Sequence, residues 1–210
     1  MSIVHLIRHG QVDNPTGILY ERLPGYHLTK LGQEMAETVA AHFADTPITH
    51  LRCSPLERAQ ETMAPIAARF PNLEVQIDPQ VTEAASRFAG QVMGSSAKAA
   101  RYPRNWHLLT NPFRPSWGEQ YQAIATRMIQ AAQEAALQVG EGGQAIIVSH
   151  QLPIWTARRQ ASNQPLWHDP RHRQCTLASV TTFHLEADAI TKITYTEPAA
   201  HLLPNRNPGF

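Results

Sequence analysis

Arginine and histidine residues stand at separate points of the chain where an expected strand ends or an expected helix begins. Arg8 and His9 follow one short apolar run, His150 follows another, and Arg58 stands near the start of an expected helix. The planar fork of a guanidinium matches phosphate oxygens, and a neutral imidazole is a good nucleophile. These residue types therefore suggest the binding of a phosphoryl group and its transfer to a histidine.

We expect His9 to attack phosphorus through one ring nitrogen, while a backbone carbonyl or similar acceptor near Gly10 holds the other. Nearby guanidinium groups disfavour the protonated imidazole, so His9 should be neutral. Arg8, Arg58 and His150 are expected to surround the phosphoryl oxygens, over which charge spreads in the transition state. All of these groups are candidate catalytic residues.

The elements around these residues explain how they could meet. Apolar runs over residues 3–7, 47–53 and 145–148 are typical of buried strands, and the candidate residues follow them. Ligands bind beyond the carboxyl ends of strands in open α/β sheets. Strands that alternate with helices predict an α/β three-layer sandwich, with a mainly parallel central sheet and helices on both faces.

The remaining elements follow from apolar spacing and capping residues. Thr29 should cap a helix whose buried face carries Leu31, Met35, Val39 and Phe43. Ser54 should cap the next helix, with Pro55 at its first position. Further elements are expected as a short strand over 74–77, helices over 118–139 and 152–161, and closing strands over 177–185 and 189–196.

The composition of the chain limits the classes of protein to which it can belong. The chain has 210 residues, 42% apolar, with a net charge of +1. We expect one domain over 1–210 and no nucleic-acid partner, because no global basic field exists. No stretch approaches the length of a membrane span, and Cys53 and Cys175 offer no disulfide framework, although one bridge stays open. A cytoplasmic protein without a membrane partner is the expectation.

Three motifs carry a family resemblance: R-H-G at 8–10, S-P-L-x-R-A-x-x-T at 54–62 and S-H at 149–150. In this order they resemble the histidine phosphatase superfamily, also called phosphoglycerate mutase-like, from residue 3 to about 155. The resemblance implies that Glu83 donates a proton to the leaving group and later activates water. Glu21, Glu57 and Glu119 are the competing carboxyl groups. No cofactor or metal is expected, because the arginines supply the positive charge.

Other positions depart from the family pattern or extend it. Asn14 lies one residue earlier than the phosphate-contacting Asn of mutases, and it is our further candidate for phosphate binding. Gln11, Arg22 and Gln151 are candidates for substrate binding. Gln11 and Gln151 replace residues common in relatives, which favours a phosphatase over a mutase.

Residues 84–118 contain no acidic side chain, and the resemblance places this segment over the mouth of the active site. We expect some of its cations, with Arg87 and Arg114 as candidates, to select a second anionic group on the substrate. An ordinary solvated surface is the alternative.

The sequence therefore predicts a phosphatase that hydrolyses a small phosphorylated metabolite through phosphohistidine. A mutase that returns the phosphoryl group to the substrate is one alternative, and a non-catalytic module that binds phosphorylated ligands is another. A small phosphorylated metabolite is the expected partner, and a homodimer is left open.

Overall fold

A single mixed sheet forms the centre of the computed structural model, which describes residues 1–92 and 118–203. Its strand order is β3-β2-β4-β1-β5-β6. The four strands from β3 to β1 pair in parallel, and β5 and β6 are antiparallel additions at one edge. The strands are β1 (Ser2–Arg8), β2 (Ile48–Cys53), β3 (Val75–Ile77), β4 (Gln144–Ser149), β5 (Val180–Glu186) and β6 (Ala189–Thr196).

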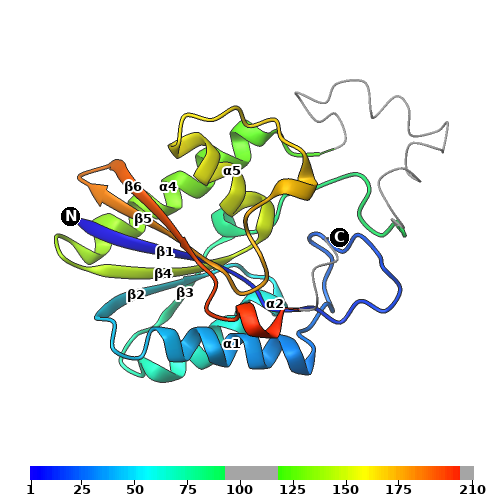
Figure 1. The fold of residues 1–210 in the computed structure, drawn as a ribbon, viewed down its shortest axis with the longest axis horizontal. Coiled ribbons are helices and arrows are strands. Elements are labelled where there is room, and N and C mark those ends of the chain that lie inside the picture. Colours follow the sequence, from blue (N-terminus) through cyan, green and yellow to red (C-terminus); the bar gives the residue numbers. More distant parts are fainter. Residues whose placement is uncertain (93–117, 204–210) are drawn as a thin grey trace.

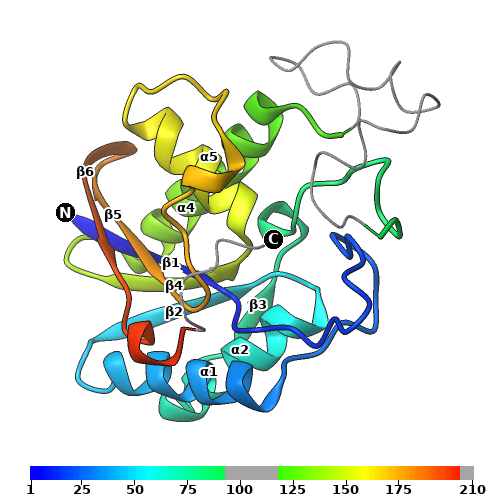
Figure 2. The same ribbon diagram turned by 45° about the vertical axis from the view of Figure 1, so that its right-hand side comes forward.

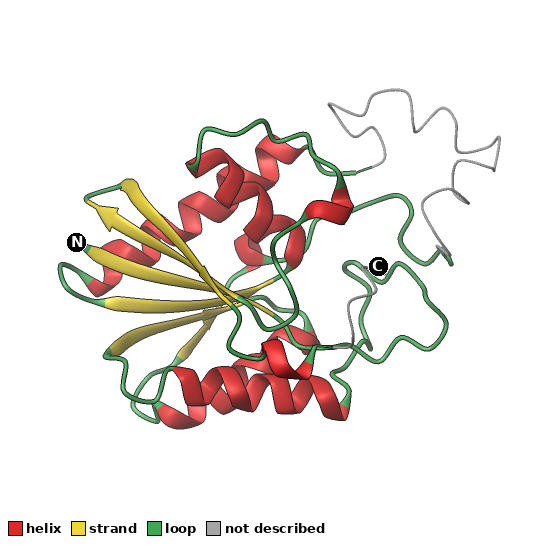
Figure 3. Ribbon diagram, in the orientation of Figure 1, coloured by secondary structure: helices red, strands yellow, loops and turns green. Residues whose placement is uncertain are grey.

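Helices cover both faces of this sheet (Figures 1 and 3). The helices α1 (Lys30–His42) and α2 (Glu57–Arg69) lie on one face, and α4 (Tyr121–Val139) and α5 (Gln151–Ala161) lie on the other. The predicted three-layer α/β class with a mostly parallel sheet is confirmed.

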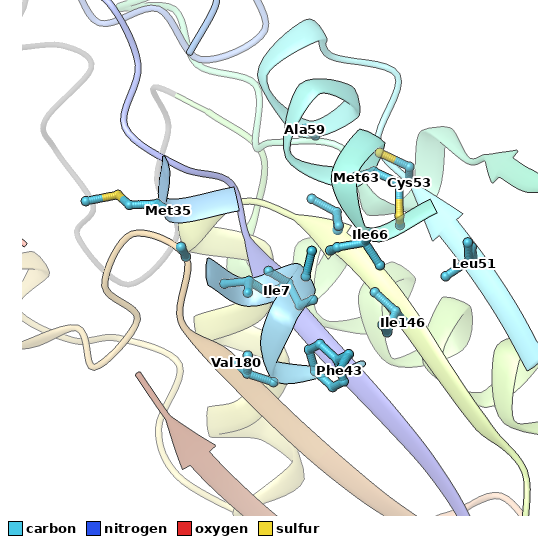
Figure 4. Packing of buried hydrophobic residues seen from close by; sticks show 14 of the residues in the cluster. Ile7, Met35, Phe43, Leu51, Cys53, Ala59, Met63, Ile66, Ile146 and Val180 are labelled. Atoms are coloured by element: carbon cyan, nitrogen blue, oxygen red, sulfur yellow. The ribbon is translucent and has the colours of Figure 1, made fainter. Parts of the chain in front are cut away.

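Each face of the sheet packs its own apolar core. Ile7 and Ile146 pack against α1 and α2, where Met35 and Met63 complete the cluster (Figure 4). Neighbouring side chains of a strand point to opposite faces, so Leu6 joins the other core beneath α4 and α5. Burial on both faces explains why these strands read as continuous apolar runs.

The structure confirms most expected elements and corrects some of their boundaries. The Thr29 hydroxyl accepts a hydrogen bond from the Gly32 N–H, so the predicted cap of α1 is confirmed. The predicted cap at Ser54 is wrong, because α2 begins at Glu57 and has no side-chain cap. The helix expected from 118 begins at Tyr121, since the Glu119 N–H bonds to the Ala85 carbonyl.

A buried arginine joins β2 to α4 and to the segment that leads to Glu83. Arg52 is 1% exposed, and its Nη1 lies 2.9 Å from an Asp78 oxygen and 3.0 Å from a Glu134 oxygen. Asp78 also accepts a hydrogen bond from the Gln80 N–H and so caps the short 3-10 helix Pro79–Val81. A buried charge is tolerated when it is paired in this way.

Some expectations fall outside the described residues. Arg114 and most of the expected covering segment belong to this group, and those expectations stay predictions. In the described ranges, no helix is long and apolar enough to cross a membrane. Cys53 and Cys175 are both buried and free.

Candidate functional site

The two candidate histidines meet because β1 and β4 are neighbours that end at the same level. Arg8 pairs in register with Ser149, and the His9 N–H donates to the Ser149 carbonyl over 3.1 Å. The ring centroids of His9 and His150 are 5.1 Å apart. The structure therefore brings together two imidazoles that are far apart in sequence.

The His9 ring is held in one tautomer. Its Nδ1 lies 2.8 Å from the Gly10 carbonyl oxygen, which can only accept, so Nδ1 carries the proton. This leaves Nε2 with its lone pair available for attack. A Cβ at Gly10 would lie 2.5 Å from the Gly32 carbonyl oxygen, so the chain can turn here against α1 only with glycine.

Both histidines are buried and neutral. Burial lowers the pKa of His9 well below its ordinary value of 6.5, and the charges of Arg58 and Arg8 lower it further. The pKa of His150 is lowered by burial first and then by the neighbouring His9, Arg58 and Arg8. The Gly10 carbonyl opposes the effect at His9 but does not reverse it.

Arg58 is fully buried at the start of α2 and is fixed by the segment after β1. Its Nη2 donates to the Glu21 carbonyl, and its guanidinium lies 4.8 Å from the centroid of the Tyr20 ring. The Nε and Nη1 atoms of Arg58 are buried without a hydrogen-bond partner among the described residues. One side of the guanidinium is therefore anchored, and the other retains donors for a ligand.

Arg8 and His150 show the same division between anchored and unpartnered atoms. Arg8 Nη1 donates to the Cys175 carbonyl over 2.7 Å, while its Nε has no partner among the described residues. His150 Nε2 lies 2.8 Å from the Ser54 hydroxyl, while its buried Nδ1 has no partner there. Ser54 serves this contact rather than capping α2.

The unpartnered donors of Arg8 and Arg58 belong to positively charged groups that have no matching carboxylate among the described residues. No described carboxylate forms an ion pair with Arg8 or Arg58. Residues 93–117 and 204–210 contain no Asp or Glu, so no acidic side chain elsewhere in the chain can supply one. Buried donors and charges without partners are costly, and an anion that binds here would satisfy them. The arrangement suits a tetrahedral oxyanion.

The backbone of Glu83 is clamped by two arginines. Arg22 Nε donates to the Glu83 carbonyl over 2.6 Å, and Arg127 Nη1 donates to the Thr82 carbonyl over 2.7 Å. Glu119 forms ion pairs with both arginines. The Glu83 carboxyl group interacts electrostatically with Arg58 and Arg173. Arg22 thus holds Glu83 in place.

The competing carboxyl groups lie in different environments. Glu119 is committed to its two ion pairs. Glu57 accepts a hydrogen bond from the Gly25 N–H, and backbone hydrogen bonds lower its pKa. Glu21 is part-buried, and loss of solvent followed by the nearby Glu83 charge raises its pKa to about 7, against the hydrogen-bonding groups of Ser86. Glu21, Glu57 and Glu83 all lie near Arg58 without forming an ion pair among the described residues, and Glu57 differs from the other two by the backbone hydrogen bonds that lower its pKa.

The loops that carry these groups pair with each other. Leu19 and Gln91 exchange a backbone hydrogen bond of 3.0 Å, and the Gly90 N–H donates to the Leu19 carbonyl. Figure 2 shows the loop after β1 beside the loop after β3, on the side where the parallel strands end. Both loops therefore contribute to one site.

The residues that the sequence predicted to bind phosphate or substrate differ from one another in their surroundings. The Asn14 amide bonds to both the N–H and the carbonyl of Ile18, so it closes its own turn. Gln11 accepts a hydrogen bond from the Thr29 hydroxyl, and Gln151 accepts one from Arg173. Arg87 is exposed. The roles of these residues stay predictions.

Several residues near the site had no role in the sequence interpretation. The Thr62 hydroxyl, inside the second motif, accepts a hydrogen bond from the Gly10 N–H and donates to the Arg58 carbonyl. Thr62 follows Arg58 by four residues on the same helix, and this spacing could have predicted that the two residues lie side by side. Arg127 and Arg173 belong to no motif, and only the folded chain brings them here.

Comparisons with known proteins agree with this geometry. Residues 4–197 match the model of the histidine phosphatase superfamily (branch 1). The chain is 50% identical to the uncharacterized protein Rv0525 of Mycobacterium tuberculosis, over 94% of this chain and 96% of that protein. It is 27% identical to a probable phosphoglycerate mutase, GpmB, of Serratia proteamaculans, covering 86% and 85% of the two chains.

Among solved structures, a phosphoserine phosphatase of Entamoeba histolytica in complex with 3-phosphoglyceric acid is similar. Its TM-score is 0.75 at 21% identity, covering 97% of this chain and all (100%) of that chain. At this identity the similarity concerns the fold.

The raised pKa of Glu21 predicts a pH-dependent cost to stability. The folded pKa of about 7 exceeds the ordinary 4.5, so the stability that the protonated form contributes is lost as pH rises from about 4.5 through 7. Glu21→Gln should therefore be more stable than the wild type at pH 8 by on the order of 2 kcal/mol, and this gain should vanish at pH 4.5. Urea unfolding at both pH values measures it, with the exposed Glu37→Gln as control. Equal gains at both pH values would contradict the assignment.

Proposed function

We propose, because this chain belongs to branch 1 of the histidine phosphatase superfamily, that it hydrolyses phosphomonoesters through a phosphohistidine formed on His9. Members of this superfamily are phosphatases or mutases. One observation carries the proposal: buried nitrogen atoms of Arg8, Arg58 and His150 that have no partner among the described residues lie around a neutral His9. Such preformed donors stabilise the charge on a phosphoryl group in transfer.

In the first step, His9 Nε2 attacks phosphorus and the bond from phosphorus to the ester oxygen breaks. The Gly10 carbonyl holds the Nδ1 proton and so keeps Nε2 as the nucleophile. Arg8, Arg58 and His150 donate to the phosphoryl oxygens. Glu83 in its protonated form gives its proton to the leaving oxygen, which departs as an alcohol.

In the second step, the Glu83 carboxylate takes a proton from a water molecule, which attacks phosphorus. The bond from phosphorus to Nε2 breaks, inorganic phosphate leaves, and both His9 and protonated Glu83 are restored. Arg22 and Arg127 position the Glu83 backbone for both steps. This chemistry uses the arginines for charge stabilisation and requires no metal or cofactor.

A phosphoglycerate mutase is the second candidate, supported by the similarity to the probable mutase GpmB. In that reaction the phosphohistidine returns its phosphoryl group to the substrate instead of to water. We favour hydrolysis over isomerisation, because Gln11 and Gln151 differ from the residues usual in relatives. The substrate that we propose is a small phosphorylated metabolite of the cytoplasm. Free phosphate release distinguishes hydrolysis from isomerisation of 3-phosphoglycerate.

His9→Ala should abolish hydrolysis, because no other group carries the phosphoryl intermediate. We expect kcat/KM to fall at least about 1,000-fold across a panel of phosphorylated metabolites and p-nitrophenyl phosphate. Phosphate release measures the activity, and rapid acid-free quenching with phosphorus NMR should detect phosphohistidine in the wild type only. The exposed His172→Ala is the control. Full activity in His9→Ala would exclude the proposed nucleophile.

The proton donor is tested through the leaving group. Glu83→Gln should lower kcat/KM for glycerol 3-phosphate by about 100-fold or more, because an alkoxide needs the proton. The loss for p-nitrophenyl phosphate should be clearly smaller, since nitrophenolate leaves without one. Glu21→Gln is the matched variant and should not reproduce this difference. If only Glu21→Gln shows it, Glu21 is the donor instead.

A further inference from the structure

Arg173 lies on a segment that crosses the ends of the central strands. Residues 162–179 connect α5 to β5 and pass on the side where β1 ends (Figure 1). Arg8 Nη1 donates to the Cys175 carbonyl over 2.7 Å, and the Ala178 N–H donates to the His9 carbonyl over 3.3 Å. Arg173 precedes the first of these contacts by two residues and therefore lies at the edge of the site.

Two neutral acceptors orient the Arg173 guanidinium. His168 Nδ1 donates to the Leu166 carbonyl over 2.7 Å, so its Nε2 accepts from Arg173 Nε over 2.8 Å. Burial lowers the pKa of His168 to about 4, so this imidazole is uncharged near neutrality. The side-chain oxygen Oε1 of Gln151 accepts a hydrogen bond from Arg173 Nη1 over 3.3 Å. The guanidinium is thus oriented without being neutralised.

The charge of Arg173 is not balanced by a carboxylate of the described residues. Arg173 forms no ion pair with a described residue, and the segments outside the description contain no Asp or Glu. By contrast, Arg52 and Arg127 are paired with carboxylates inside the fold. A part-buried guanidinium without a counter-ion lowers stability, and an anionic ligand would remove that cost.

The position of Arg173 relates it to the phosphoryl site. It interacts electrostatically with Arg8 and with Glu83. The two negative charges of a phosphomonoester are already matched by Arg8 and Arg58, which makes Arg173 a third cation. We propose that Arg173 binds a second anionic group of the substrate, a carboxylate or a phosphate, beside the phosphoryl group that is transferred.

This inference rests on the proposed function and narrows it to a class of substrates. A guanidinium fork pairs with a planar carboxylate or with phosphate oxygens through two parallel hydrogen bonds. The substrate would be a small phosphomonoester with such a group a few bonds from the ester oxygen. Gln151 and His168 become positioning residues for Arg173.

The test compares ligands that differ only in the second anion. Affinities for phosphoglycolate against ethyl phosphate, and for 3-phosphoglycerate against glycerol 3-phosphate, are measured by calorimetry on His9→Ala, which prevents turnover. We expect the acid to bind at least about tenfold more tightly in one pair or both. Arg173→Gln in the same background should reduce that ratio to about twofold or less.

Arg171→Gln is the matched control, because Arg171 lies two residues away, is exposed and pairs with Asp169; its ratio should not change. Arg173→Lys keeps the charge but loses the fork, so it should show an intermediate ratio, and it serves if Arg173→Gln does not fold. Three results would overturn the inference: an affinity ratio near one in His9→Ala itself, a ratio that Arg173→Gln leaves unchanged, or an equal loss of affinity for both ligands of a pair. Because this experiment measures binding without hydrolysis, a failure of the inference about Arg173 can be distinguished from a failure of the proposed phosphatase activity.

Discussion

Positive charge without a carboxylate partner, placed at the carboxyl ends of the parallel strands, is the constraint on which the site depends. Arg58 is fully buried and Arg8 is part-buried, and neither forms an ion pair with the acidic side chains of the chain. The same charges help to keep His9 neutral. One electrostatic arrangement therefore both attracts an anion and prepares the nucleophile that attacks it.

The rest of the fold holds this unfavourable arrangement in place. Neutral groups anchor the cations: the Glu21 and Cys175 carbonyls accept from Arg58 and Arg8, and Thr62 ties α2 to the turn after His9. An acidic residue, Glu119, instead forms ion pairs with Arg22 and Arg127, the two arginines that hold the backbone at Glu83. Carboxylates thus stabilise the surroundings of the site without neutralising it.

The sequence predicted those parts that depend on local pattern. Apolar runs marked the strands, and motifs after strand ends marked His9, Arg58 and His150, because the carboxyl ends of parallel strands must meet. The cap at Ser54 was wrong because α2 begins only at Glu57, and the Ser54 hydroxyl makes a long-range contact with His150 that no local rule contains. Arg173 was missed for the same reason: the segment over the strand ends brings it near Arg8, and no spacing in the sequence records that path.

The central claim is that one tetrahedral anion fits among four side chains that are distant in sequence. A crystal structure with orthovanadate tests it most directly. The account predicts vanadium within bonding distance of His9 Nε2, with its oxygens contacted by Arg8, Arg58 and the Nδ1 atom of His150. Vanadate bound elsewhere, or bound here without contact to both histidines, would contradict the account.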